Sequence, residues 1–349
     1  MEITSPTLGP RAGHPSLRRF PFSSSLRVSS SYRLPLSSLP KPKFPTTQRL
    51  TTPVAMSLAS SSQPASSPSG LPDIGSEVSS SGLIGENDLL IVGPGVLGRI
   101  VAERWHREHP GCQIFGQTMT IDHHEELINI GIKPILRGPL ETQKFPYVIF
   151  CAPPSRSPDY IGDVRQAASC WSGDGSLLFT SSTAAYDCND NSPCDEDSHI
   201  VPLGRSPRTD VLLRAEEAVL GVGGCVLRLA GLYISSQRGA HVYWLEKGTV
   251  DSHPDHVLNL IHYEDAASLS VAVLNKKLRG RIFLGCDNHP LSRRELMDYV
   301  NKSGKFSKKF VGFTGTSDPL GKRLSNSKTR AEIGWEPKYT SFPYFLEQL

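Results

Sequence analysis

Three glycines with the spacing Gly93-x-Gly95-x-x-Gly98 carry the clearest chemical signal in this 349-residue sequence. They directly follow the apolar run 88–92 and begin an amphipathic stretch over 96–109. Between a buried strand and a helix, such glycines form a tight turn, let the backbone approach a pyrophosphate and allow close packing of helix on strand. The free amides and positive dipole end of the helix attract phosphate. The sequence therefore predicts a dinucleotide site formed by Gly93, Gly95, Val96, Leu97, Gly98 and Arg99, with a purely structural turn as the alternative.

A second group of candidate residues is a pair of hydroxyls at the end of another apolar run, 176–181. Ser182 and Thr183 follow that run directly. Open α/β folds bind their ligands at the carboxyl edge of a parallel sheet. We therefore expect Ser182 and Thr183 to be the catalytic candidates.

The choice of cofactor depends on the strand expected over 112–117. An NAD site usually has Asp or Glu about 20 residues after the glycines, to bind the ribose 2′-hydroxyl. Here the first acid is Asp122, beyond the strand, whereas Gln117, Thr118 and Arg99 offer hydrogen-bond donors. The pattern favours NADP, with NAD as the alternative, and Arg99 fits a solvated position equally well. Ala152 and Pro153, which end the next strand, should run past the adenosine.

These residues belong to a chain in which short apolar runs alternate with amphipathic stretches, as in βαβ units. We predict strands at 88–92, 112–117, 147–151, 176–181, 225–230 and 281–284, and helices at 96–109, 122–131, 158–170, 210–221, 263–276 and 293–303. The fold class is thus α/β, a doubly wound parallel sheet of the Rossmann type. Residues 73–239 would form the NAD(P)-binding domain and 240–349 a smaller C-terminal substrate lobe.

Four segments together resemble one known family. They are Thr180-Ser-Ser-Thr-Ala-Ala-Tyr186, Val226-Leu-Arg-Leu-Ala-Gly-Leu-Tyr233, Leu260-Ile-His-Tyr-Glu-Asp-Ala-Ala267 and Ser325-Asn-Ser-Lys-Thr-Arg-Ala-Glu-Ile-Gly-Trp-Glu-Pro337. Their types and order resemble the extended short-chain dehydrogenases/reductases of the epimerase/dehydratase type, over about residues 86–349. The resemblance implies that Ser182 hydrogen-bonds the substrate. We expect His262 to brace the sheet, with a catalytic role as the alternative.

The chain departs from that family at the proton-transfer pair. The family's Tyr-x-x-x-Lys is absent from the corresponding window, 204–217, and Tyr186 belongs to the serine segment, where a packing role is expected. Arg208, Asp210 and Arg214 stand in the window, either to orient an anionic substrate or a water, or simply as solvated charges.

Two interpretations of function follow. The first is an NAD(P)-dependent oxidoreductase or epimerase that acts on a small carbonyl or sugar-like substrate. The second is an NADP-sensing or assembly factor that has lost catalysis. RNA binding is a distant third.

The first 72 residues differ in composition from the rest. They hold eight Lys or Arg, one acidic residue and many Ser, Thr and Pro, which is typical of a transit peptide. We expect residues 1–72 to be a transit peptide and disordered linker, cleaved near Ala55 for import into the chloroplast stroma. An ordinary disordered basic tail is the alternative.

Without that segment the chain has 29 basic and 33 acidic residues, a net charge of about −4, which argues against nucleic acid as a partner. No run of 18 apolar residues predicts a membrane span. The seven cysteines have no metal-ligand spacing and should be free thiols, although Cys188 and Cys194 share a loop where a redox switch is conceivable. His123-His-Glu-Glu126 lacks the two-histidine spacing of a zinc site, so no metal is expected.

Overall fold

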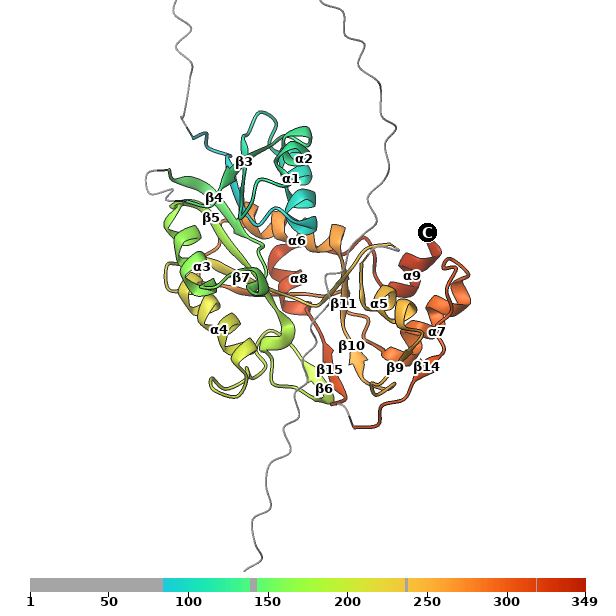
Figure 1. The fold of residues 1–349 in the computed structure, drawn as a ribbon. Coiled ribbons are helices and arrows are strands. Elements are labelled where there is room, and N and C mark those ends of the chain that lie inside the picture. Colours follow the sequence, from blue (N-terminus) through green and yellow to red (C-terminus); the bar gives the residue numbers. More distant parts are fainter. Residues whose placement is uncertain (1–83, 139–142, 236–237, 318) are drawn as a thin grey trace, which may run out of the picture. The chain divides into compact units, whose positions relative to one another are not determined.

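The computed structural model describes residues 84–138, 143–235, 238–317 and 319–349. The targeting segment and cleavage site predicted within residues 1–72 lie outside these residues. In the described part the chain folds around a seven-stranded sheet flanked by helices (Figure 1).

All neighbouring strands in this sheet run parallel. The order is β12-β7-β5-β4-β1-β2-β3. The strands span Leu89–Val92 (β1), Ile114–Thr118 (β2), Ile132–Leu136 (β3), Phe145–Phe150 (β4), Trp171–Ser182 (β5), Cys225–Leu229 (β7) and Ile282–Gly285 (β12). Because the chain builds outward from β1 in one direction and then from β4 in the other, the strand order reverses between β1 and β4. Ligands of doubly wound folds bind at this point. The predicted α/β fold class is confirmed.

Helices cover both faces of the sheet, so its strands are buried on both sides. Leu89 and Ile91 of β1 pack in a core with Trp105 of α1 (Val96–Glu108), to which α6 (Tyr263–Lys276) also contributes. Leu90 and Val92 point to the opposite core, built with α3 (Tyr160–Ser169) and α4 (Pro207–Leu220). This is why the four apolar residues of β1 show no polar alternation.

Most predicted elements are present, with shifted ends. The helices predicted at 263–276 and 293–303 match α6 and α7 (Arg293–Ser303) residue for residue. Helix α4 starts three residues earlier than predicted, because Ser206 caps it and Pro207 is favoured at the first helical position. Helix α2 (His124–Asn129) is shorter than predicted. Strand β3 was not predicted, since it contains Pro134, which a sheet tolerates at its edge.

The remaining short strands and the helices α5 (Ala240–Lys247), α7, α8 (Ser327–Ile333) and α9 (Phe342–Glu347) of the described residues form a smaller lobe. A four-stranded sheet has the order β13-β10-β15-β6, and two further pairs join β11 with β8 and β14 with β9. These strands span Asp190–Cys194 (β6), Gly231–Tyr233 (β8), Thr249–Val250 (β9), Val257–Leu258 (β10), Leu260–His262 (β11), Leu291–Ser292 (β13), Gly312–Phe313 (β14) and Gly321–Leu324 (β15). Helices α5, α7 and α9 share an aromatic-rich core. The segment from residue 240 onward also returns to the large sheet through β12 and α6.

A buried ion pair joins three elements of the large sheet. Glu216 of α4 accepts from Arg228 of β7, whose Nη2 donates at 2.6 Å and whose Nε is shared between the two carboxylate oxygens at 3.1 and 3.3 Å. The Ser181 hydroxyl of β5 donates to the same carboxylate at 2.5 Å. Both charged residues are 3% exposed, and the guanidinium lies 4.7 Å from the ring centre of Tyr186. Both oxygens of the buried carboxylate thus have hydrogen-bond donors, which a buried charge requires.

We predict that Arg228→Met lowers the free energy of unfolding by about 3–5 kcal/mol, because Glu216 is then buried without its cation. Replacing both partners by Met should recover at least half of that loss. The matched control is Arg281→Met, which breaks the exposed pair Arg281–Glu332 and should cost less than about 1 kcal/mol. Urea unfolding of the three variants measures this, and a double variant as unstable as Arg228→Met would contradict it.

Candidate dinucleotide and substrate site

The turn between β1 and α1 has the geometry that a dinucleotide needs. Gly93 has φ of +80°, and a Cβ there would lie 2.7 Å from the backbone of Ala152, so only glycine fits. A Cβ on Gly98 would lie 2.9 Å from Cγ2 of Ile91, which shows how closely α1 packs on β1. At Gly95 the nearest atom to such a Cβ is 4.0 Å away, and Gly95 is exposed. The turn is therefore closed toward the protein and open on its outer side.

The first turn of α1 is free to bind an anion. No side chain caps the helix, and no acidic residue lies in its first turn. The amides and dipole of a 13-residue helix thus face the open side of Gly95 uncompensated. Val96 is half-buried and Leu97 is buried, so these two residues offer only backbone to a ligand. A pyrophosphate group fits this cradle.

The end of β2 holds the residues considered for cofactor choice. Gln117 is 7% exposed, and its buried Nε2 has no hydrogen-bond partner among the described residues. Thr118 is engaged, since its hydroxyl lies 2.7 Å from Nε2 of His124. Arg99 forms an ion pair of 2.8 Å with Glu126 of α2, whose pKa is held low by this bond and by His123. Sequence spacing did not identify Glu126 as the partner of Arg99. Glu126 lies beyond the end of β2, in α2, and only the fold brings its carboxylate to the guanidinium.

Ala152 and Pro153 lie where β4 ends. The amide of Cys151 donates to the carbonyl of Val92, which places Ala152 against Gly93. Tyr160 donates its phenol proton to the Ala152 carbonyl at 3.0 Å, and Pro153 is exposed. The structure thus brings both residues beside the glycine-rich turn.

Ser182 and Thr183 lie at the end of β5, on the same edge of the sheet. Ser182 is half-buried and accepts a hydrogen bond from the amide of Ala184 at 3.2 Å, so it caps the short 3₁₀ turn η2 (Thr183–Ala185). Since that oxygen accepts, the hydroxyl proton of Ser182 is available to a substrate oxygen. Thr183 is also half-buried.

Helix α4 supplies no proton-transfer pair. The first helical position is Pro207, and the buried face carries Thr209, Leu212 and Leu213. Arg208 and Arg214 are exposed, and Asp210 accepts from the amide of Gly204. These three charges therefore act as solvated or loop-bracing groups.

Tyr186 is buried beneath the site. Its exposed fraction is 1%, and burial raises its pKa to about 12 despite the neighbouring Arg228. Such a phenol stays protonated near neutral pH, which agrees with a packing role.

The His-x-x-Asp segment braces the start of α6. His262 accepts from the amide of Glu264 through Nδ1, and burial lowers its pKa to about 4. Asp265 accepts from the amides of Lys338 and Tyr339 at 2.7 and 2.9 Å. Both residues therefore hold the C-terminal segment on the sheet rather than facing a ligand.

Sequence reasoning missed Lys322 of β15. Its Nζ donates to the carbonyls of Thr183 and Tyr186 at 3.0 and 2.6 Å. The lysine lies 139 residues from Thr183, and its sequence context has no chemical signature.

The described residues also bear on metal binding, membrane spans and disulfide bonds. No cluster of His, Cys, Asp and Glu there could hold a metal ion. The helices of that part of the chain are too short or too polar to cross a membrane. The seven cysteines, all within it, are free thiols.

Comparison with known proteins places this geometry in a wider group. No protein-family model and no curated protein matches the chain. Solved structures do match its fold. A conserved protein of unknown function from Silicibacter pomeroyi shares 22% identity with a TM-score of 0.61, covering 75% of this chain and 97% of that one.

Two further matches are enzymes solved with NAD. The dTDP-glucose 4,6-dehydratase of Bacillus anthracis shares 14% identity with a TM-score of 0.61 over 75% of this chain and 94% of that one. The UDP-glucuronic acid 4-epimerase of Bacillus cereus shares 17% with a TM-score of 0.60 over 74% and 94%. At these identities the likeness establishes the fold, that of Rossmann-type epimerases.

One buried carboxyl group, Asp287, lies outside this site at the end of β12. Its Oδ1 accepts from the amide of His289 at 2.9 Å, whereas Oδ2 is buried without a partner among the described residues. Burial raises its pKa to about 8, although His289 partly opposes this. In the folded chain the Asp287 carboxyl group thus keeps a proton that an unfolded aspartate releases at about pH 4.

We therefore predict that the contribution of Asp287 to stability falls as pH rises from about 4 to about 8, because its carboxyl group takes up a proton on folding in that window, whereas the lowered pKa of His262 acts in the opposite direction. Asp287→Asn keeps the acceptor for His289 and should remove this contribution, which is at most about 1.4 kcal/mol per pH unit. Denaturant unfolding at several pH values measures the difference. The exposed Asp298→Asn serves as control. Parallel stability curves for Asp287→Asn and the unmodified chain would refute the assignment.

Proposed function

We propose that this chain binds a nicotinamide dinucleotide across the carboxyl ends of β1, β4 and β5 and acts as an oxidoreductase or epimerase on a small carbonyl or sugar-like substrate. The observation that carries the proposal is the turn Gly93–Gly98, closed against Ala152 and open before the uncapped end of α1. The fold neighbours support it, since they include a dehydratase and an epimerase of sugar nucleotides solved with NAD.

Each part of the site would have a separate role in binding or in the reaction. The amides of the first turn of α1 hold the pyrophosphate. When bound, the dinucleotide would accept or donate the hydride. Ser182, fixed as the cap of η2, donates its hydroxyl proton to the substrate oxygen, and Thr183 orients the same group. Because α4 offers no tyrosine or lysine, we propose that the substrate proton is exchanged with solvent.

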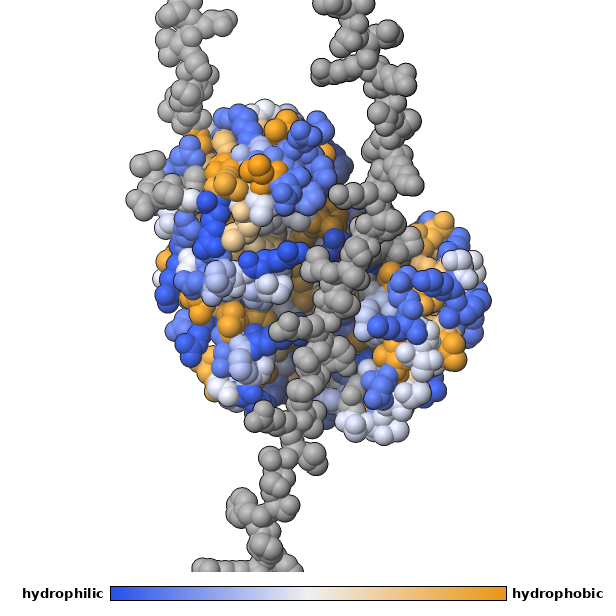
Figure 2. All heavy atoms as spheres, viewed as in Figure 1, coloured by the Kyte–Doolittle hydropathy of each residue, from blue (hydrophilic) through white to orange (hydrophobic). Residues whose placement is uncertain are grey.

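The adenosine would lie across the ends of β2 and β3. Met119 and Leu136 are exposed there, by 50% and 49%, beside further exposed apolar side chains over α2 (Figure 2). Apolar side chains at this edge offer a face on which the adenine base can pack.

We predict that Gly95→Asp weakens dinucleotide binding by about a hundredfold or more, because its carboxylate would face the pyrophosphate at close range. The fold should tolerate the change, since the position has room and Asp is a preferred helix cap. Gly95→Asn is the matched neutral control and should weaken binding less. Fluorescence titration with the reduced dinucleotide, together with the melting temperature, tests this. Unchanged affinity in a folded Gly95→Asp variant would exclude the site.

We further propose that NADP is preferred to NAD. The donors that sequence reasoning assigned to this site are Gln117, Thr118 and Arg99; Gln117 Nε2 has no partner among the described residues, Thr118 is bonded to His124, and no acid lies on β2. A 2′-phosphate would take Arg99 from Glu126, whose exposed carboxylate can turn to solvent.

On this basis Arg99→Gln should reduce NADP affinity about tenfold, or about 1.4 kcal/mol, with little effect on NAD. Glu126→Gln should raise NADP affinity, because it removes both the competing partner and a negative charge. Dissociation constants for the two dinucleotides measure the ratio. An NADP to NAD ratio that neither variant changes would argue against the preference.

A measurement of turnover distinguishes an enzyme from a non-catalytic dinucleotide-binding protein. We expect Ser182→Ala to lower kcat by a hundredfold to about ten-thousandfold while dinucleotide affinity is retained. A panel of sugar nucleotides and small carbonyl compounds, followed by absorbance of the reduced nicotinamide and by product analysis, provides the assay. Thr180→Ala, in the same strand, is the control because its hydroxyl donates to the Phe150 carbonyl within the sheet.

The missing proton-transfer pair keeps a second function open, that of a non-catalytic NADP sensor or assembly factor. Tight NADP binding without any turnover across that panel would favour it. Turnover lost in Ser182→Ala would exclude it.

A further inference from the structure

Lys322 connects the C-terminal lobe to the serine segment. It lies in β15, which pairs with β6 and β10 in the small sheet. Its Nζ donates to the carbonyls of Thr183 and Tyr186, which lie at the two ends of the η2 turn. The lysine thus bridges that turn from outside the large sheet.

The bonding of Lys322 differs from that of three exposed lysines elsewhere in the C-terminal part of the chain. Lys308, Lys328 and Lys338 are exposed and pair with carboxylates. Lys322 is half-buried, and among the described residues its ammonium has two neutral carbonyls and the Tyr186 ring, 6.0 Å away, but no carboxylate within ion-pair distance. Burial lowers its pKa, partly opposed by Cys194, Cys188 and Asp187.

Holding a cation against neutral acceptors costs desolvation energy. The contact is best explained by the geometry that it fixes. Ser182 directly precedes the bridged turn and accepts from the amide of Ala184 within it. The direction of the Ser182 and Thr183 hydroxyls therefore depends on a turn whose two carbonyls Lys322 holds.

We infer that Lys322 is a positioning residue, through which the C-terminal lobe sets the orientation of the Ser182 and Thr183 hydroxyls. This inference rests on the proposed function, in which Ser182 donates to the substrate. It also assigns a lysine to this site in a chain whose α4 has none in the usual window. Lys322 contacts the carbonyls of the turn rather than reacting atoms.

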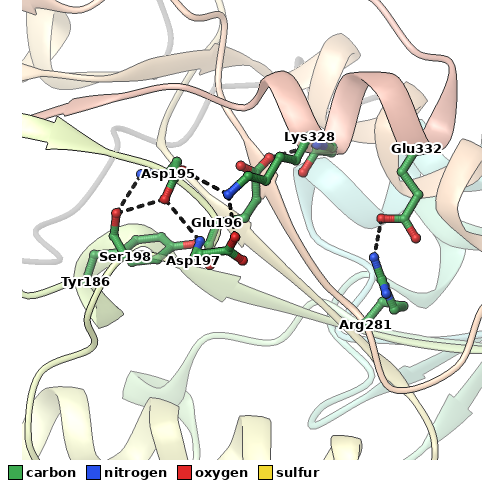
Figure 3. A network of polar contacts seen from close by, with 9 residues as sticks. Tyr186, Asp195, Glu196, Asp197, Ser198, Arg281, Lys328 and Glu332 are labelled. Atoms are coloured by element: carbon green, nitrogen blue, oxygen red, sulfur yellow. Dashed lines mark hydrogen bonds and ion pairs between the residues drawn. The ribbon is translucent and has the colours of Figure 1, made fainter.

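A neighbouring lysine offers a matched control. Lys328 of α8 also ties the C-terminal part of the chain to the segment that follows η2, by ion pairs with Asp195 and Asp197 (Figure 3). Glu196, between them, accepts from the amide of Thr329. These contacts hold the loop after β6. Tyr186 also meets this loop, since its phenol donates to the Glu196 carbonyl at 3.5 Å, but Lys328 bonds neither the Thr183 nor the Tyr186 carbonyl.

The test compares Lys322→Met and Lys322→Arg with Lys328→Met. Lys322→Met should lower kcat about tenfold to a hundredfold, the size expected for a misplaced catalytic group, with dinucleotide affinity unchanged. Lys322→Arg, which keeps charged donors, should recover part of the loss. Lys328→Met should stay near the unmodified chain. Should Lys322→Met not fold, Lys322→Gln replaces it.

A second measurement separates this inference from the proposed function. With the dinucleotide bound, amide hydrogen exchange in residues 184–186 should be at least about tenfold faster in Lys322→Met than in Lys328→Met, whether or not a substrate is turned over. If the unmodified chain shows no turnover, the proposed enzyme fails and exchange alone decides the role of Lys322. Equal exchange in both variants, or a loss of dinucleotide affinity as large as the loss of kcat, would overturn the inference.

Discussion

The buried pair between Glu216 and Arg228 is the interaction on which the rest of the described structure depends most. It connects α4 to β7 and, through Ser181, to β5, directly below the serine segment. Neither charge could stay in this core without the other, because an unpaired buried ion costs several kcal/mol. The pair therefore fixes which face of α4 meets the sheet and keeps Ser182 at the sheet edge.

This constraint lets α4 pack on the sheet although the helix carries no tyrosine or lysine. Pro207 opens the helix, Ser206 caps it, and apolar residues together with Glu216 face the core. The helix anchors the sheet, and in the proposed function the site at the sheet edge would rely on the hydroxyls of Ser182 in β5 and Thr183 in η2. A lysine approaches that turn from β15 instead of from α4.

The glycine-rich turn of the proposed cofactor site is subject to a different constraint, which is steric. Gly93 lies against the backbone of Ala152, just after β4, so the turn cannot carry a side chain there, whereas Gly95 is open. Steric requirements of this kind are local in sequence and leave a spacing pattern. The electrostatic part is not local: Glu126 reaches Arg99 across 27 positions and changes how the end of β2 would meet a 2′-phosphate.

The sequence by itself determined the strand, turn and helix around Gly93, the alternation that makes a parallel sheet, and the position of Ser182, because each depends on neighbours within a few residues. It did not reveal β3, since Pro134 weakens the strand pattern and only pairing with β2 makes that segment a strand. Tertiary structure alone decided the partners of Glu216, Arg99 and Thr183, which lie 12, 27 and 139 positions away. A charged side chain leaves no periodic signal of its partner, so pairs of this kind exist only once the fold has brought their elements together.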